Sequence, residues 1–413
     1  MSKIESVLHA TDGQKADRDS CDVVIIGAGP VGLSMSLSLR SAGLEVTLIE
    51  RQPLDVIAAP TYDGREIALS HRSVEILSKL GAWRRISNDQ VSPLKSATVI
   101  NGRSRSRLQF DAKAVGADKL GFLVSNHNIR RALYDEHAQK GKATLIAGAN
   151  ATSISAGATG ASVTLADGRT LHAKLLIAAD TRFSAARRSA GISASIHDFG
   201  KTMIVSRMKL DQPHDHIAWE CFLPGGALAV LPLNEGEASI VQTFAPDEAE
   251  QQMALSLDEY AAASAKRLGH RFGALHPVSE RFSYPLVGVY ANRFVGSGFA
   301  LVGDAAVGMH PVTAHGFNLG VQGQDVLAGQ IHRAVRRDAS PSDATALAAY
   351  ERAHRKLSAP LYWSTLALAE LYSDESLPAR LARRVLLDAG RALPPARRMI
   401  MKSLTQPLTS AMH

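Results

Sequence analysis

The sequence predicts an α/β protein with a mostly parallel sheet, an inserted β-rich domain and a helical C-terminal tail. Three short apolar runs begin at Val23, Leu175 and Phe299, and each is closed by a Gly or an Asp. Runs of this kind are typical of strands buried on both faces of a parallel sheet. They lie roughly 120–150 residues apart, so one α/β domain is assembled from distant segments. Strand patterns dominate residues 200–244 between them, and helical patterns run from Gly320 onward.

Composition limits the class of protein. The chain has 413 residues, 46% of them hydrophobic and 21% charged, which excludes disorder, collagen and coiled coil as its main description. The net charge is +7, but the 11 Phe, 8 Tyr and 3 Trp are too scattered for a base-stacking platform, so we expect no nucleic acid partner. Cys21 and Cys221 form no C-x-x-C motif, which excludes a disulfide scaffold and a Cys-rich metal site and favours a reducing compartment.

The domain boundaries follow from these patterns. Residues 1–20 carry charges throughout, without the apolar region of a secretory signal, and are predicted to be a disordered lead-in. No run of about 18 apolar residues occurs, so no membrane span is predicted. We assign the α/β domain to 21–88, 120–198 and 285–340, the β-rich domain to 89–119 and 199–284, and the helical C-terminal region to 341–413.

Local patterns predict the elements in order. A strand over 23–26, a helix over 31–40 closed by Gly43, and a strand over 45–49 form one βαβ unit. One helix is predicted across 64–83, ending near Gly81. Turn residues at 224–226 predict a hairpin over 218–233. The remaining predictions are helices over 126–139 and 257–268, and strands over 144–171 with turns at 156–160 and 167–168.

A glycine-rich loop between the first strand and helix predicts a dinucleotide site. Gly27, Gly29 and Gly32 form G-x-G-x-x-G, in which the first Gly allows the tight turn, the second admits a pyrophosphate and the third lets helix and strand pack closely. The helix N-terminus then presents free N–H groups and its positive dipole end to the phosphates. Glu50 ends the second strand, where its carboxylate can accept hydrogen bonds from a ribose. An acidic residue there favours FAD or NAD over NADP.

Two further motifs follow the other buried strands. Asp180 lies in LLIAADTRFSAAR, and Asp304 lies in FALVGDAA at the C-terminal end of its strand, where α/β sheets bind ligands. The Asp304 carboxylate can accept hydrogen bonds from a polyol chain. In the following HPVTAHGFNLG, Pro311 and the Gly316 region can lie flat beside a planar ring. Asn318 begins a helix whose start can stabilise negative charge developing on a ring carbonyl.

The three motifs in this order resemble the single-component FAD-dependent aromatic hydroxylases, with a para-hydroxybenzoate hydroxylase-like fold. Within them, the chain is most similar to the ubiquinone-biosynthesis hydroxylases of the UbiH/UbiF/UbiM group, and the Thr313-Ala314-His315 variant favours the UbiM branch. The shared stretches are DGREIALSHRSVEILSKLGAW, LGFLVSNHNIRRAL, AWECFLPGGALAVLPL and GDAAVGMHPVTAHGFNLG. The resemblance implies a Rossmann-like FAD/NAD(P)-binding domain and a β-rich substrate domain.

The resemblance also implies a cofactor, FAD, with O2 and NAD(P)H or another reductant as co-substrates. The residues that it implies for FAD binding are Gly27, Gly29, Gly32 and Glu50 at the ADP part, Arg65 and Arg130 at the phosphate or ribityl region, Asp304 at the ribityl chain, and Pro311, Gly316, Phe317 and Asn318 beside the isoalloxazine ring. Asp180 belongs to a motif that serves both FAD and the nicotinamide donor.

Two positions depart from the family pattern. Thr181 replaces a Gly after Asp180, and its side chain narrows the approach of a nicotinamide donor. Ala314-His315 replaces Gly-Gln before the Gly that contacts the ring. His315 is therefore a candidate proton relay or hydrogen-bond donor, with a satisfied loop histidine as an equal alternative. His310 is the second histidine of the predicted catalytic region.

The implied reaction is hydroxylation of the aromatic ring of a ubiquinone-biosynthesis intermediate, a polyprenylated phenol or quinol. In the family, a hydroperoxide on the reduced flavin transfers its terminal oxygen, and the protein supplies orientation and water exclusion. Phe222, Leu223, Leu231 and Pro232 of the hairpin are candidate pocket walls, with ordinary hairpin core as the alternative. No metal site is predicted, because His214 and His216 have no third ligand at sensible spacing. Three alternatives stay open: a hydroxylase of a soluble phenol, a flavin-dependent isoprenoid reductase, and a non-catalytic escort protein.

The C-terminal segment, 376–413, predicts an association. Seven basic residues and one acidic residue lie between Ser376 and Lys402, with an apolar stripe at about helical spacing. Such a segment fits an anionic membrane surface or a ubiquinone-biosynthesis assembly, and a helix packed on its own domain is the alternative. We expect a cytoplasmic protein held peripherally at the inner membrane. The oligomeric state stays open, a homo-oligomer included.

Overall fold

The computed structural model describes residues 20–102, 107–141, 143–223, 225–310 and 315–373. Its first sheet has a parallel core in the order β19-β11-β1-β2-β8, flanked by antiparallel β18 on one side and by the β9–β10 hairpin beside β11. The strands are β1 (Ser20–Ile26), β2 (Val46–Glu50), β8 (Thr144–Ala147), β9 (Ala151–Gly157), β10 (Gly160–Leu165), β11 (Thr170–Ala178), β18 (Val295–Gly296) and β19 (Phe299–Leu301). The three predicted buried strands thus lie side by side, although they are distant in sequence.

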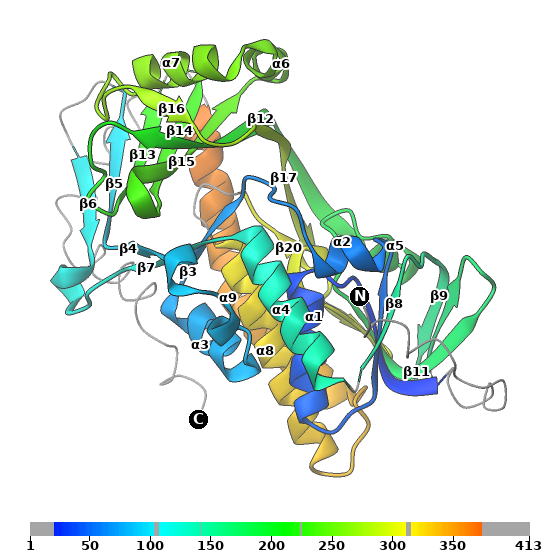
Figure 1. The fold of residues 1–413 in the computed structure, drawn as a ribbon. Coiled ribbons are helices and arrows are strands. Elements are labelled where there is room, and N and C mark those ends of the chain that lie inside the picture. The colour runs from blue at the N-terminus through cyan, green and yellow to red at the C-terminus, as the bar shows by residue number, and fades with distance from the viewer. Residues whose placement is uncertain (1–19, 103–106, 142, 224, 311–314, 374–413) are drawn as a thin grey trace, which may run out of the picture.

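Helices cover this sheet. Helix α1 packs on α4 and α8, and α8 packs on α9, as the parallel bundle below the centre of Figure 1 shows. The helices of this domain are α1 (Pro30–Ser41), α2 (Leu54–Ala58), α3 (His71–Leu80), α4 (Asn126–Lys140), α5 (Ala185–Ser189), α8 (Gly316–Val335) and α9 (Ala344–Ser373). Pairs such as Val23 and Leu175 are fully buried beneath them, so the apolar runs read from the sequence form the main core.

The predicted single helix over 64–83 is wrong in its first part. Residues Glu66–Leu69 form strand β3, which pairs with β7 (Gly121–Ser125), and β4 (Ser92–Leu94) completes a three-stranded sheet. The helix begins only after Ser70, whose hydroxyl accepts a hydrogen bond from the Ser73 N–H and caps it. It ends at Gly81 with φ +90°, as predicted. Four residues are too few to separate a strand from a helix by periodicity.

The second large sheet has the order β20-β17-β12-β15-β14-β13-β5-β6, with β16 beside β12. Its strands are β5 (Ser96–Asn101), β6 (Arg107–Asp111), β12 (Ala194–Leu210), β13 (Ile217–Leu223), β14 (Gly226–Pro232), β15 (Glu237–Phe244), β16 (Leu275–Pro277), β17 (Phe282–Ala291) and β20 (Val307–Gly308). The β13–β14 pair is the predicted hairpin. Helices α6 (Pro246–Ala254) and α7 (Leu257–Arg267) lie over one face, and the other face looks toward β3, β4 and β7 (Figure 1).

Two predicted regions lie outside the described residues: most of the lead-in, 1–19, and the basic C-terminal segment, 376–413. Within the part of the chain that the structure describes, no helix is long and apolar enough to cross a membrane.

Candidate functional site

The glycine loop has the geometry that a pyrophosphate needs. Gly27 has φ +103°, and a Cβ there would lie 2.5 Å from the Ala179 carbonyl oxygen. A Cβ on Gly32 would lie 1.9 Å from the Gly27 oxygen, so these two glycines are required by contacts within the protein. Gly29 differs, because a Cβ there would meet no protein atom within 4 Å. The space beside Gly29 faces the start of α1, whose first-turn N–H groups have no partner within the helix.

Glu50 is tied to this loop. One of its carboxylate oxygens accepts a hydrogen bond from the Ala28 N–H at 2.8 Å, and the other accepts from the Gln52 N–H at 3.0 Å. A carboxylate has about four acceptor positions, so both oxygens keep capacity for a ribose hydroxyl. Arg130 lies close by, and its guanidinium donates to the Gln52 side-chain oxygen at 3.2 Å.

Asp304 lies at the carboxyl edge of the parallel sheet, just after β19. Its side chain is 41% exposed and pairs with Arg182 at 3.3 Å, while Arg182 also donates to the Val287 carbonyl at 2.9 Å. Burial lowers the pKa of the Arg65 guanidinium, but nearby acidic groups raise it by more. Asp63 contributes most to this rise, and Asp304 lies near enough to contribute as well. The structure thus brings Arg65 and Asp304 together from segments 239 residues apart in number (304 − 65).

Asp180 caps the turn after β11. One carboxylate oxygen accepts from the Ala185 N–H at 3.1 Å, and the other is buried without a hydrogen-bond partner among the described residues. Burial raises the pKa of the Asp180 carboxyl. Thr181 beside it is exposed.

The start of α8 stands over the glycine loop. A Cβ on Gly320 would lie 2.9 Å from a Val31 methyl, so this Gly allows the close approach. His315 is the N-cap of α8, and Phe317 packs against the main core. The Asn318 side chain forms hydrogen bonds with the β3–α3 junction. Its amide donates to the Ala68 carbonyl, and its oxygen accepts from the Ser70 N–H and the Ser73 hydroxyl. The Asn318 side chain therefore positions the helix, and Pro311 lies outside the described residues.

His310 precedes that helix. Its ring packs edge-on against Phe199 with centroids 4.5 Å apart, and burial, with smaller effects from Arg182 and His197, lowers its pKa to about 4. The imidazole is therefore neutral at physiological pH, which leaves it able to exchange hydrogen bonds but not to carry a charge there. His214 and His216 belong to a turn instead, since His214 accepts from the His216 N–H at 3.1 Å and contacts the Leu233 carbonyl at 2.8 Å. Among the described residues no cluster of metal ligands occurs.

The four predicted pocket walls divide between the two faces of the hairpin. Leu223 packs with Trp219 and Cys221 in the cluster beneath α6 and α7, because alternate residues of a strand share a face. Pro232 shares that face with Leu228 and Val230 of the same cluster. Phe222 and Leu231 alternate with these residues and lie on the opposite face, toward the FAD-loop domain. The structure thus brings together two of the four.

The comparisons with known proteins fit this geometry. Residues 20–361 match the FAD binding domain family. The chain is 44% identical over 388 residues to the ubiquinone hydroxylase UbiM of Neisseria meningitidis, covering 93% of this chain and 84% of that protein. The chain belongs to this FAD-binding hydroxylase family. It is also 34% identical over 381 residues to the ubiquinone hydroxylase UbiL of Rhodospirillum rubrum, covering 92% and 88% of the two chains.

The fold itself is shared more widely. The structure is similar to that of p-nitrophenol 4-monooxygenase PnpA from Pseudomonas putida, with a TM-score of 0.75 at 20% identity over 94% of this chain and 98% of that one. The chain is an FAD-dependent monooxygenase with the α/β architecture that the sequence predicts.

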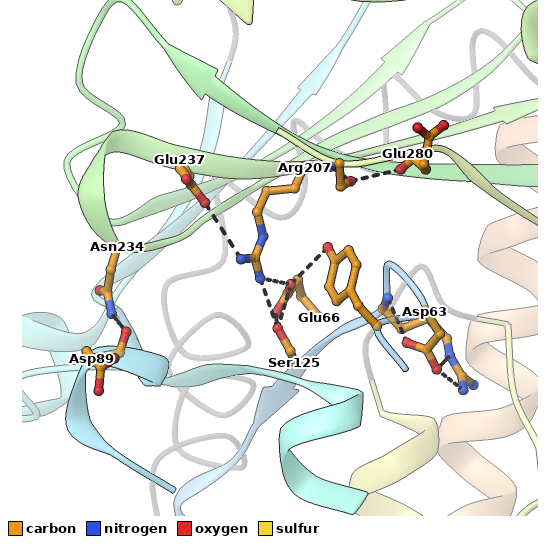
Figure 2. Close-up of polar contacts among 11 residues, drawn as sticks. Asp63, Glu66, Asp89, Ser125, Arg207, Asn234, Glu237 and Glu280 are labelled. Atoms are coloured by element: carbon orange, nitrogen blue, oxygen red, sulfur yellow. Dashed lines mark hydrogen bonds and ion pairs between the residues drawn. The ribbon is translucent and has the colours of Figure 1, made fainter. Parts of the chain in front are cut away.

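This monooxygenase has a polar cluster between its second large sheet and the three-stranded sheet that sequence reasoning missed. We call it the Arg207 cluster, and Figure 2 shows how Arg207 reaches from β12 to the three-stranded sheet. Arg207 donates to Glu66 at 2.6 Å and to Ser125 at 3.0 Å, and its other nitrogen lies 3.7 Å from Glu237. Ser125 lies 2.8 Å from both Glu66 oxygens, and the Tyr62 hydroxyl donates to Glu66 at 3.4 Å. Burial raises the pKa of Glu66, and the nearby Arg207 limits that rise.

A second missed residue is Arg187, at the end of the DTRFSAAR motif. It is only 2% exposed and donates to the carbonyls of Arg182 at 3.1 Å and Ala305 at 2.9 Å. It therefore joins the Asp180 segment to the Asp304 segment. The sequence offered one signal for Arg187, since it is a basic residue within a motif assigned to cofactor binding. The sequence did not show that its side chain is buried.

Proposed function

We propose that this monooxygenase hydroxylates the aromatic ring of a prenylated phenol or quinol on the route to ubiquinone. The observation that carries this proposal is the 44% identity to UbiM over 93% of this chain, because the match spans both the cofactor loop and the sheet above it. A hydroxylase of a soluble phenol has no such support from the comparisons. The ring carbon that is attacked is a separate question for the experiment below.

The proposed FAD site uses residues whose surroundings suit it. The space beside Gly29 accommodates the pyrophosphate, Glu50 accepts bonds from the ribose, and Arg130 stands near the phosphates. Asp304 and Arg65 would hold the ribityl chain, and the N-terminus of α8, from Gly316, would stabilise negative charge on the ring. Bound FAD, once reduced, supplies the activated oxygen for the ring.

The glycine loop offers a direct test of this site. Gly29→Ala places a methyl group in the space meant for the pyrophosphate while touching no protein atom, so we expect a folded protein that retains little flavin. Flavin absorbance per mole of purified protein measures this. A fully loaded Gly29→Ala protein would contradict the assignment of the site.

We further propose that NAD(P)H or another reductant delivers electrons near Asp180, and that residues 376–413 hold the enzyme on an anionic membrane where a prenylated substrate resides. The basic composition of that segment supports the membrane contact. Liposomes containing phosphatidylglycerol should pellet the full chain at low salt and release it at high salt. Equal pelleting after removal of 376–413 would contradict the role of this segment.

Complementation tests the proposed reaction. Bacterial strains blocked at each ring-hydroxylation step of ubiquinone biosynthesis are transformed with this chain, and quinone intermediates are read by mass spectrometry. We expect ubiquinone to return in at least one strain, which also identifies the ring position. Failure in every strain, with the flavoprotein present in the cells, would contradict the proposal.

A further inference from the structure

One carboxylate on the second large sheet, that of Glu220, lacks the partners that the carboxylates of the Arg207 cluster have. Glu220 lies on β13, opposite Ala229 of β14 and Val99 of β5. Its strand neighbours Trp219 and Cys221 are buried in the cluster under α6 and α7. Because strand residues alternate, Glu220 points to the other face, from which Arg207 reaches Glu66 in the three-stranded sheet. Glu220 therefore faces the domain that contains the glycine loop.

Small side chains surround Glu220 on this face. We define the Glu220 face as Glu220 with the partly exposed residues Ala97, Val99, Ala218, Ala227, Ala229 and Leu231 and the buried Phe222. Four of these are alanines, whose side chains project little above the sheet. Glu220 itself keeps accessible surface although protein surrounds it. Phe222 and Leu231 lie on the same face as Glu220.

Glu220 has no partner in this setting. Within the part of the chain that the structure describes, no hydrogen bond, ion pair or nearby charge accompanies its carboxylate. Burial alone raises its pKa to about 8. An unpaired carboxyl group in apolar surroundings costs stability, so such groups are found where a ligand completes them.

Other charges do not account for this behaviour. The side chains facing Glu220 from β14 and β5 are uncharged, and β15 presents Ser239, Val241 and Thr243 on this face. β15 also carries Glu237 on this face, where it lies 3.7 Å from Arg207 of β12, and Glu66 engages the same Arg207. On α9, which packs near β14, Glu370 lies 3.5 Å from His197.

We propose that Glu220 binds the ring hydroxyl of the substrate and accepts its proton during hydroxylation. This inference rests on the proposed function, since it assigns the residue that recognises the phenol. The O–H bond of the phenol breaks, its electron pair stays on the ring oxygen, and the proton forms a new O–H bond on the Glu220 carboxylate. The more electron-rich ring is then ready to attack the oxygen that the cofactor supplies. The hydrogen of the attacked ring carbon leaves as a proton to the oxygen that stays with the cofactor, and the Glu220 proton returns to the ring oxygen of the product, so Glu220 is regenerated.

The test compares Glu220→Gln with wild type in the FAD-loaded enzyme. The substrate probe is a 2-prenylphenol with two isoprene units, and Glu237→Gln on the same sheet is the control. General acid–base groups contribute about 100-fold or more, so we expect kcat of Glu220→Gln to fall by at least about 100-fold. The wild-type kcat should rise with pH through an inflection near pH 8, and this inflection should vanish in Glu220→Gln. Glu237→Gln should keep both kcat and the inflection.

A binding measurement separates this inference from the proposed function. In a pH titration, the 19F chemical shift of bound 4-fluoro-2-prenylphenol should change with a midpoint near pH 8 in wild type. In Glu220→Gln the midpoint should lie near the pKa of the free phenol. If Glu220→Gln fails to fold, the same measurement on Glu220→Asp should show the midpoint retained and kcat reduced. A Glu220→Gln enzyme with kcat within twofold of wild type and the same midpoint would overturn the role of Glu220. A wild-type enzyme that binds the probe but forms no product would instead overturn the proposed function.

Discussion

Two glutamates of this monooxygenase have opposite surroundings. Glu66 in the Arg207 cluster receives hydrogen bonds from Arg207, Ser125 and Tyr62, while Glu220 on its alanine-rich face receives none. Burial raises the pKa of both carboxyls. A buried charge is tolerated when its partners are in place, and it costs stability when they are missing. The cluster therefore joins β12 of the second large sheet to the three-stranded sheet, and the unpaired carboxyl is the group available to a ligand.

The largest expected effect concerns the stability of Glu220→Gln at different pH values. The folded-state pKa of Glu220, about 8, lies above its ordinary 4.5, so the stability linked to this group is full below pH 4.5 and is lost as pH rises to 8. At about 1.4 kcal/mol per unit, Glu220→Gln should gain up to about 4 kcal/mol over wild type between pH 5 and pH 8. Urea denaturation of the two proteins at several pH values measures the gain. A constant difference across this range would show that Glu220 is not desolvated.

The next effect is the loss of the cation in the Arg207 cluster. Arg207→Met leaves Glu66, whose side chain is only 1% exposed, without its charged partner, and should cost about 3 kcal/mol. The pKa of Glu66 then rises further, so the loss should be larger at pH 8 than at pH 5. Denaturant midpoints at both values test this.

A surface pair supplies the control for that variant. Arg169 pairs with Asp167 at 2.7 Å, but both side chains are about half exposed, so Arg169→Met should cost less than about 1 kcal/mol. Equal losses in the two variants would contradict a special role for the buried cluster.

Removing the serine of the cluster should have a smaller effect. Ser125→Ala deletes the hydroxyl that donates to Glu66 and accepts from Arg207, and should cost about 1–2 kcal/mol. Thermal denaturation reports the change, with Ser153→Ala on exposed β9 as the reference. A loss no larger than that of the reference would mean that Arg207 alone satisfies Glu66.

The smallest effect is expected at Ser239. Its hydroxyl is buried on the same face as Glu220 and has no hydrogen-bond partner among the described residues. Ser239→Ala therefore removes no bond and should change stability by less than about 0.5 kcal/mol, in the stabilising direction. A loss comparable to that of Ser125→Ala would show that the two regions do not differ as described.

The sequence predicted those features of the site that depend on residues close together in the chain. The roles of Gly27 and Gly32 depend on contacts within or beside one βαβ unit, and the structure has the steric requirements that the motif implies. The Arg207–Glu66 pair joins residues 141 apart, and Glu66 lies in a strand too short to be recognised by its period. The importance of Glu220 depends on which face of β13 it occupies and on which partners are absent there. Neither condition is readable from the order of residues.

Isotope labelling tests the central claim most directly. The purified FAD-loaded enzyme is supplied with a reductant, the 2-prenylphenol probe and 18O2, and the mass of the product is measured by mass spectrometry. The account predicts that each molecule of reductant consumed yields one molecule of product whose new ring hydroxyl contains 18O. Reductant consumption that yields only hydrogen peroxide, or a product whose new oxygen comes from water, would contradict it.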